Sequence, residues 1–381
     1  MASGSPGSSR RSPSGPVVSG RARNRALLAR QMLLHRHDLD VVGAVERLVG
    51  LQAQAPWSPY VSVWSRIERF DPHRLGQALL DRELVRIVVM RGTIHLVSAA
   101  DACELRPLVQ PLLDKDIATN ASHAAGLAGI DLDELARATH EVLADEPLSP
   151  RALGVALATR FADRPPAALG HGARNRVPLV QTPPRAVWGR TGGTAYATLE
   201  QWLDRPLSRR PDLAAMAQRY FAAYGPATVQ DLQTWCGLTR LAPVVDGLRD
   251  QLVLFTTEDG RQLYDLPDAP RPDPSTPAPI RFLPDYDNLL RSHADRSFVV
   301  ADAHRRRALA TPNGVVPSTV LVDGEVRAVW RHASRGDSAV LSVEPLEPLD
   351  DHQAEEIEAE GHRLLELLDT SAEPTVTIAR S

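Results

Sequence analysis

One order of predicted secondary structure recurs along the chain: helices first, then two β-rich runs separated by a tight turn. The clearest copy is "DLAAMAQRYFAAYGPATVQDLQTWCGLTRLAPVVDGLRDQLVLFTTEDGRQLYDL", which predicts three helices followed by two strands around Asp259-Gly260. Asp-Gly between apolar runs is a strong hairpin signal. Helices followed by a two-stranded ribbon are the order of a winged helix, so the pattern predicts units of this type.

A similar order appears twice before that copy. Helices are predicted over 21–35 and 40–52 and in "SPYVSVWSRI", and "DPHRLGQALLDRELVRIVVMRGTIHLVS" then predicts a helix and two strands around Arg91-Gly92. Two helices in "LDELARATHEVLADEPLSPRALGVAL" precede "RVPLVQTPPRAVWGRTGGTAYATLEQWL", which predicts a Gly-rich wing. After a Pro-rich connector, Asp323-Gly324 marks another hairpin, and a helix near 351–369 is expected to close the chain.

The expected fold is therefore α+β and mainly α, with three tandem winged helices and a C-terminal β element. Tandem units of this kind favour a long nucleic-acid surface, because one unit contacts only part of a helical turn. A purely structural, protein-scaffold role stays open, since the recognition helices carry few base-reading lysines and asparagines. The expected parts are a disordered tail (1–20), three winged helices (21–125, 126–208 and 209–270) and a C-terminal region with a β-hairpin and closing helix (271–381).

Composition excludes several classes. No run of about 18 apolar residues exists and the N-terminus lacks the apolar segment of a signal peptide, so we expect a soluble cytoplasmic protein without a membrane partner. Cys103 and Cys236 are the only cysteines and lack CxxC spacing, so we expect neither a metal nor another cofactor. Lys115 is the only lysine, which leaves a Schiff-base mechanism one internal candidate.

Charge is segregated along the chain. The formal net charge is −4, yet no acidic residue precedes Asp38, and the stretch "DDHQAEEIEAE" after Leu349 is strongly acidic. A basic face is therefore compatible with an acidic exterior. The basic residues that gather before Asp38 are Arg10, Arg11, Arg21, Arg23, Arg25, Arg30 and Arg36.

Two glutamines interrupt an apolar stripe. One helical turn after Leu48, the position expected to be aliphatic is Gln52, and an unpaired buried amide costs about 1–3 kcal/mol. Pro56 favours an extended path before it, and in an extended segment residues two apart share a face. Gln52, at the last helical turn, and Gln54 are therefore expected to converge on a polar cleft. That these amides only cap helix carbonyls or hold the loop is about equally compatible with the spacing.

Several separated blocks resemble the winged-helix DNA glycosylases of the AlkZ type. They are "LVGLQAQAPWSPYVSVWSRI", "MRGTIHLVSAADA", "YGPATVQDLQTW", "FLPDYDNLLRSHADRSFVV" and "VLVDGEVRAVWR". The resemblance implies a C-shaped stack of three winged helices around a concave, basic DNA-binding channel. It also implies hydrolysis of the N-glycosidic bond of alkylated purines, with a Gln-apolar-Gln catalytic motif at Gln52, Ala53 and Gln54. A housekeeping branch carries an acidic residue at the second polar position, so Gln54 favours the branch that gives antibiotic producers self-resistance.

The expected function is thus a monofunctional DNA glycosylase that acts as a monomer on double-stranded DNA containing bulky or crosslinked N7-alkylated purines and leaves an abasic site. An amide suffices for such lesions: N7-alkylguanine already carries a positive charge, so the enzyme mainly has to place a water molecule on the sugar. General repair of small alkyl lesions remains an alternative within the enzyme class. A non-catalytic winged-helix transcription regulator is the alternative outside it.

Further candidates surround these motifs. Arg91 at the first wing tip and Arg291, His293 and Arg296 in "LLRSHADRSF" are expected to contact DNA phosphates, although Asp287–Arg291 or Asp295–Arg296 ion pairs explain the latter segment equally well. For the remaining candidates a structural role is favoured over a functional one: hydrogen bonding over a general base or metal ligand for Asp285 and Asp287, exposure on the outer strand face over a substrate contact for His95, and packing over stacking on an adduct for Trp57.

Overall fold

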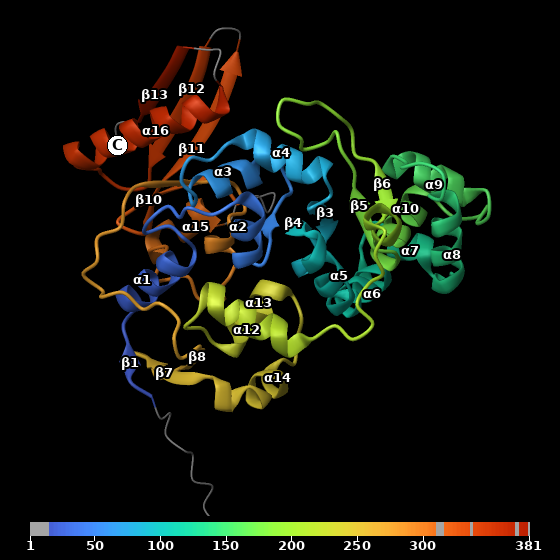
Figure 1. Cartoon of the computed structure of the whole chain (residues 1–381), viewed down its shortest axis with the longest axis horizontal. Helices are drawn as coiled ribbons and strands as arrows, with labels where there is room; N and C mark the ends of the chain where they lie inside the picture. Colours follow the sequence, from blue (N-terminus) through green and yellow to red (C-terminus); the bar gives the residue numbers. More distant parts are fainter. Residues whose placement is uncertain (1–14, 310–315, 336–337, 370–372, 380–381) are drawn as a thin grey trace, which may run out of the picture.

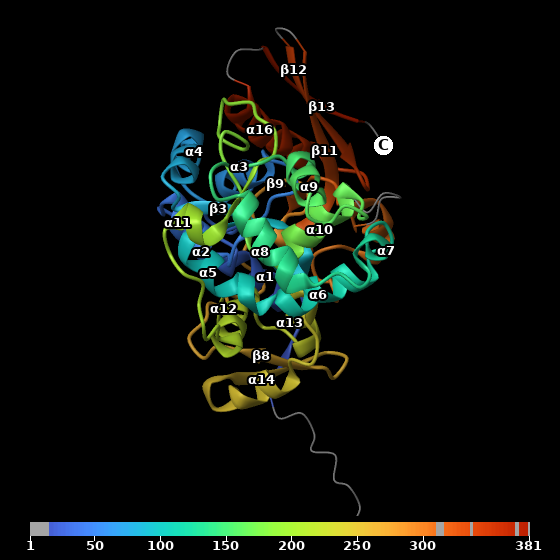
Figure 2. The same cartoon turned by 90° about the vertical axis from the view of Figure 1, so that its right-hand side faces the viewer.

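The computed structural model describes residues 15–309, 316–335, 338–369 and 373–379, which form an α+β fold in which helices predominate. The C-terminal sheet lies at the upper left of Figure 1, residues 213–265 lie at the bottom, and residues 124–198 form a lobe at the right. The side view places this lobe in front, between the other two parts (Figure 2). Over the described ranges, no helix is both long and apolar enough to cross a membrane.

The first unit comprises the elements from α1 to α6. It surrounds a sheet in which β2 (Leu51–Gln52), β4 (Ile94–Ser98) and β3 (Leu84–Val88) are neighbours. Strands β3 and β4 form the predicted hairpin, which turns through η1 (Met90–Gly92). Every residue of both strands is buried, because each face of the sheet packs into a different apolar cluster: Val85 and Val97 belong to one, Leu84 and Leu96 to the other. The unit's helices are α1 (Gly20–Arg30), α2 (Val41–Arg47), α3 (Ser58–Trp64), α4 (Pro72–Leu80), α5 (Ala99–Leu108) and α6 (Gln110–Thr119).

The second unit extends the same sheet. Strand β5 (Leu179–Gln181) pairs with β3 and with β6 (Tyr196–Thr198), which gives the order β2-β4-β3-β5-β6. The predicted Gly-rich wing is the long connection between β5 and β6. The expected boundary at residue 126 therefore divides units that share one sheet. The helices here are α7 (Ala124–Leu127), α8 (Leu132–Val142), α9 (Pro150–Ala158), α10 (Pro166–Arg176) and α11 (Leu199–Leu203).

The third unit contains the predicted hairpin at Asp259-Gly260, between β7 (Val253–Thr257) and β8 (Gln262–Asp265). The edge of β7 pairs in parallel with β1 (Val17–Val18), and Ser19 caps α1 by accepting a hydrogen bond from the Ala22 amide. The expected disordered tail is thus wrong for residues 15–20, because an open strand edge offers them backbone partners; residues 1–14 lie outside the described ranges. The helices are α12 (Leu213–Tyr224), α13 (Val229–Cys236), α14 (Ala242–Gly247) and η2 (Arg249–Gln251).

The C-terminal region is a five-stranded sheet with the order β13-β12-β11-β10-β9. The predicted hairpin at Asp323-Gly324 joins β10 to β11. The predicted last helix, α16, is present, but a further strand follows it and pairs in parallel with β12, so the helix does not close the chain. The elements are β9 (Arg281–Leu283), η3 (Asn288–Leu290), η4 (Asp302–His304), α15 (Arg305–Leu309), β10 (Thr319–Val322), β11 (Glu325–Arg335), β12 (Ser338–Pro345), α16 (Asp351–Leu368) and β13 (Glu373–Ile378).

The arginines near the N-terminus hold these parts together. Arg30 is buried and pairs with Asp265 of β8 at 2.6 Å, and Arg25 pairs with Asp323 of the C-terminal hairpin. The others that the structure describes are also paired: Arg21 with Asp323, Arg23 with Asp231 and Arg36 with Glu360. A planar guanidinium suits such buried, bidentate pairs. The basic face expected from these residues is therefore not formed by them; Arg10 and Arg11 lie outside the described ranges.

Candidate active site

Gln52 lies on a strand. The sequence predicts it on the last turn of a helix over 40–52, but α2 ends at Arg47 and the chain reverses through Val49 (φ 54°) and Gly50 (φ 90°). A Cβ at Gly50 would lie 2.6 Å from Cγ1 of Val97, so only glycine lets β2 begin this close to β4. The prediction overlooked this glycine as a helix stop.

The orientation of the Gln52 amide follows from its partner. The Nη2 atom of Arg91 donates to Oε1 of Gln52 at 2.8 Å. Because a guanidinium has donors only, the atom that faces it must be the carbonyl oxygen, and the NH2 group points the other way. The Gln52 side chain is buried, with only 5% of the residue exposed. One amide of the motif is therefore fixed before any substrate binds.

Arg91 points into the protein. It adopts a left-handed conformation (φ 56°) in η1, donates to the carbonyl of Trp235 as well as to Gln52, and lies with Nη2 3.2 Å from Nε2 of His95. Burial, reinforced by the charge of Arg291, lowers its pKa to about 10. The expectation of a phosphate contact at the wing tip is wrong, because the turn directs the side chain toward α13 and the core.

His95 is the third member of this cluster. Only 1% of the residue is exposed, so the predicted exposure is wrong: the face of the sheet expected to meet solvent is covered. Burial first, and then the charge of Arg91, lower its pKa to about 3, which keeps the ring neutral. Its Nδ1 lies 3.0 Å from the carbonyl of Thr93 and therefore carries the proton. Nε2 is then an acceptor for the Arg91 guanidinium.

Gln54 is the exposed glutamine of the motif. Its Oε1 accepts a hydrogen bond from the Ile94 amide at 3.2 Å, while the amide of Ala53 donates to the Ile94 carbonyl at 2.8 Å. The strand ends at Gln52, and the chain bends at Gln54 and Ala55, where an extended path before Pro56 was expected; the buried Ala53 separates the buried Gln52 from the exposed Gln54. Both carbonyl oxygens already accept one hydrogen bond. Both amides therefore present NH2 groups, and Gln54 presents its group to solvent.

The three residues predicted to bind phosphate in one segment, Arg291, His293 and Arg296, lie in different environments. Arg291 is half-buried, its charge lowers the pKa of both Arg91 and His95, and its Nε lacks a hydrogen-bond partner within the described part of the chain. Arg296 is also half-buried and donates to the Leu290 carbonyl at 3.1 Å. The ion pairs considered for these two, with Asp287 and Asp295, do not occur between the described residues. Arg291 thus borders the candidate site, whereas Arg296 supports its own loop.

His293 is a structural residue. It is 1% exposed, with Nε2 3.1 Å from the Tyr224 carbonyl and Nδ1 2.9 Å from Oγ of Ser292. Burial lowers its pKa to about 4. Since a carbonyl only accepts, Nε2 carries the proton and Nδ1 accepts from the serine hydroxyl. Both nitrogens are engaged in the interior, so the predicted phosphate contact by His293 is wrong.

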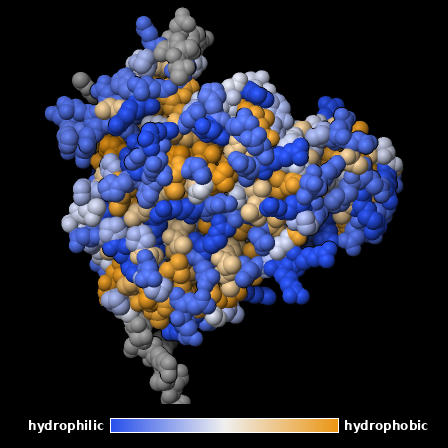
Figure 3. Space-filling model, in the orientation of Figure 1, coloured by the Kyte–Doolittle hydropathy of each residue, from blue (hydrophilic) through white to orange (hydrophobic). Residues whose placement is uncertain are grey.

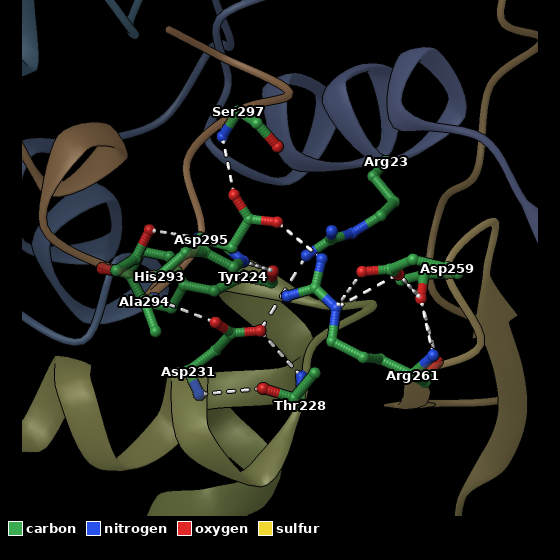
Figure 4. Close-up of polar contacts among 12 residues, drawn as sticks. Arg23, Tyr224, Thr228, Asp231, Asp259, Arg261, His293, Ala294, Asp295 and Ser297 are labelled. Atoms are coloured by element: carbon green, nitrogen blue, oxygen red, sulfur yellow. Dashed lines mark hydrogen bonds and ion pairs between the residues drawn. The ribbon is translucent and has the colours of Figure 1, made fainter. Parts of the chain in front are cut away.

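Neighbours of His293 attach this segment to the third unit (Figure 4). The Ala294 amide donates to Asp231 at 2.9 Å, and Asp295 pairs with Arg261 at 2.6 Å. Although burial opposes it, hydrogen bonds from Arg261 and Ser297 hold the pKa of Asp295 well below its usual range. Asp295 therefore serves as an anchor for the loop.

The remaining candidates also have partners. Asp287 makes a buried pair with Arg66 at 2.7 and 2.9 Å, which confirms a structural role. Asp285 accepts from Oγ of Ser58, and burial raises its pKa. Trp57 packs edge-on against Trp330 with ring centroids 5.9 Å apart, as predicted, but 36% of it is exposed.

Comparison with known proteins decides the family. Residues 45–367 match the family described as "DNA glycosylase AlkZ-like", a range that includes both glutamines, Arg91 and Arg291. The chain belongs to this AlkZ-like family of DNA glycosylases. Membership implies a hydrolase that acts on N-glycosyl bonds and binds DNA.

A relative and a solved structure agree with this assignment. The chain is 26% identical over 332 residues to an "Interstrand DNA cross-link repair glycosylase" of Streptomyces sahachiroi, a match that covers 80% of this chain and 85% of the relative. The fold of the present chain is similar to that of the S. sahachiroi DNA glycosylase AlkZ. The TM-score is 0.79 at 21% sequence identity, and the match covers 95% of this chain and 100% of the solved chain. The AlkZ-like fold is thus present over nearly the whole molecule.

Proposed function

We propose that this protein hydrolyses the N-glycosidic bond of bulky or crosslinked N7-alkylated purines in DNA, leaves an abasic site, and protects its host against a DNA-alkylating natural product. The observation that carries the proposal is the pair of amides on one short segment, Gln52 held by Arg91 and Gln54 open to solvent. The relative that is named for interstrand crosslink repair supports the substrate class. Gln54, in place of an acidic residue, supports the self-resistance role.

The chemistry follows from the state of the amides. An N7-alkylated guanine leaves as a neutral base, so the reaction needs no general acid. The second lone pair of the Gln54 oxygen accepts a hydrogen bond from water, and its NH2 group donates to the deoxyribose or a phosphate. Gln52, buried and oriented by Arg91, positions the sugar or Gln54. Such weakly basic groups confine the enzyme to substrates whose base is already a good leaving group.

We further propose that the three helix-and-hairpin units act as winged helices whose concave side binds the duplex as a monomer, with Arg291 at the edge of the site on a phosphate. The exposed surface in Figure 3 mixes hydrophilic residues with apolar patches. Because Lys115 is the only lysine, the reaction stops at the abasic site without an imine. Borohydride trapping of a protein–DNA adduct would contradict that step.

The direct test is single-turnover release of free base from a duplex with one N7-alkylguanine. We expect wild-type protein to release it, and Gln52→Ala and Gln54→Ala to lower the rate by roughly a hundredfold or more. Rates equal to wild type in both variants would overturn the catalytic assignment. Release of N7-methylguanine as fast as of bulky or crosslinked adducts would instead favour general alkyl-purine repair.

A further inference from the structure

A large aromatic cavity lies next to the glutamine segment. It has a volume of about 1240 Å³, above the roughly 300–1,000 Å³ of ordinary small-molecule pockets. Three of the chain's six tryptophans line it, from three distant parts of the sequence: Trp57, Trp188 and Trp330. We call it the tryptophan cavity. This concentration of indole rings points to a planar ligand.

Trp57 presents an uncovered ring. Of the aromatic side chains that the structure describes, it is the only exposed one, although burying a large aromatic ring is normally favourable. Its contact with Trp330 is T-shaped and occupies at most one face of each ring. Trp330 is itself buried and donates from Nε1 to the Leu283 carbonyl at 2.9 Å. Trp330 is therefore fixed in place, and it supports Trp57, whose ring is free to stack on a ligand.

Trp188 is a second ring of the cavity, and its neighbour Tyr60 supports it. It packs on Tyr60 with ring centroids 4.8 Å apart, and the Tyr60 hydroxyl donates to the Ala186 carbonyl at 2.7 Å. Trp188 is half-buried, so part of its ring remains accessible. The charged lining residues are Arg306, Arg307, Arg331, Asp285 and Glu344, and Arg307 pairs with Glu344. Because both signs of charge are present, aromatic stacking rather than charge selects the ligand.

The cavity is connected to the glutamine segment through Trp57. Trp57 follows Gln54 by three residues, which limits the distance between their Cα atoms to about 11 Å. We propose that the tryptophan cavity binds the planar aromatic group carried by a bulky N7-purine adduct while Gln52 and Gln54 act on its glycosidic bond. This inference rests on the proposed function and specifies its substrates: alkylating compounds with a fused-ring aromatic substituent.

The experiment compares three duplexes whose single N7-alkylguanine carries a methyl, a cyclohexylmethyl or an anthracenylmethyl group. The proteins are wild type, Trp57→Ala, Trp188→Ala and the control Trp202→Ala, a half-buried residue of α11 that lies outside the cavity and whose ring contacts Arg82. We expect each cavity variant to lower kcat/KM for the anthracenylmethyl adduct by about tenfold, as loss of a stacking contact does. The other two adducts should change less than twofold, and the control should match wild type.

Equal losses on all three adducts, or no selective loss on the anthracenylmethyl adduct, would overturn the cavity proposal and leave the glycosylase proposal intact. Binding of duplexes that carry the same adducts on uncleavable 2′-fluoro nucleotides separates the two proposals. If wild type releases no base, the proposed function fails. The cavity proposal then stands only if Trp57→Ala and Trp188→Ala selectively weaken binding of the anthracenylmethyl duplex, and otherwise falls as well.

Discussion

Arg91 donates from Nη2 to Oε1 of Gln52 at 2.8 Å, and it does so from a turn whose left-handed backbone directs the side chain inward. The same guanidinium contacts the Trp235 carbonyl of α13 in the third unit. The orientation of a candidate catalytic amide in the first unit therefore depends on how the third unit is docked. This dependence gives Arg91 a positioning role that a phosphate-binding arginine would not have.

Replacing Arg91 with lysine tests this role. An ammonium group lacks the fork that reaches Gln52 and Trp235 together, so we expect the single-turnover rate to fall roughly ten- to a hundredfold. In Arg91→Met, which removes the charge, the dependence of DNA affinity on salt should keep its wild-type slope, because no phosphate contact is lost. Arg291→Met, at the half-buried neighbouring position, is the comparison variant and should reduce the slope by about one. A slope reduced by about one in Arg91→Met, with an unchanged rate in Arg91→Lys, would show that Arg91 contacts a phosphate after all.

Local signals predicted much of the fold. The turns at Arg91-Gly92, Asp259-Gly260 and Asp323-Gly324 all join antiparallel strands, since hairpin chemistry depends on a few adjacent residues. The path before Pro56 was not predicted correctly, because the chain bends at Gln54 and Ala55 where an extended segment was expected. Pairings between distant segments were not predictable either: β5 extends the sheet of β3, and Val17–Val18 extends the sheet of β7, through backbone bonds that no side-chain pattern specifies.

The site was predicted only in part. The glutamines were found because they interrupt an apolar pattern, but Gly50 places Gln52 on a strand, and its partner Arg91 was assigned to the surface. An arginine in a turn normally faces solvent, and only tertiary packing turns this one inward. His95 was misplaced for a related reason: alternation along a strand indicates exposure only when one face of the sheet is open. Here both faces are covered.

The rate of base release should not depend on pH between about 5 and 9. Glutamines do not titrate, His95 has a pKa of about 3, and Arg91 one of about 10, so no group of the cluster changes charge in this range. Gln54→Glu should introduce a rise in rate with pH near the ordinary glutamate pKa of about 4.3, whereas Gln54→Met should be slow at every pH. A wild-type inflection between pH 5 and 6 would indicate a catalytic carboxylate instead.

The pair of Arg66 and Asp287 should be essential for stability and dispensable for chemistry. Both side chains are fully buried, so Asp287→Asn leaves an uncompensated guanidinium. We expect a loss of about 3–5 kcal/mol in the free energy of unfolding, measured with denaturant, and partial recovery in the double variant Arg66→Met/Asp287→Asn. The release rate per folded molecule should stay within twofold of wild type. A rate lowered by orders of magnitude in a folded Asp287→Asn protein would show that this carboxylate takes part in the reaction.

Acid should destabilise the protein through its buried histidines. The pKa of His293 is lowered from 6.5 to about 4 in the native state, so between these pH values the unfolded chain binds a proton that the folded chain excludes. The free energy of unfolding therefore falls as pH decreases from 6.5 to 4, by about 3 kcal/mol for this residue. His293→Gln should reduce that slope, whereas His352→Gln, at an exposed position on α16, should not. Denaturant unfolding at several pH values measures both, and equal slopes in the two variants would mean that His293 is protonated in the native state.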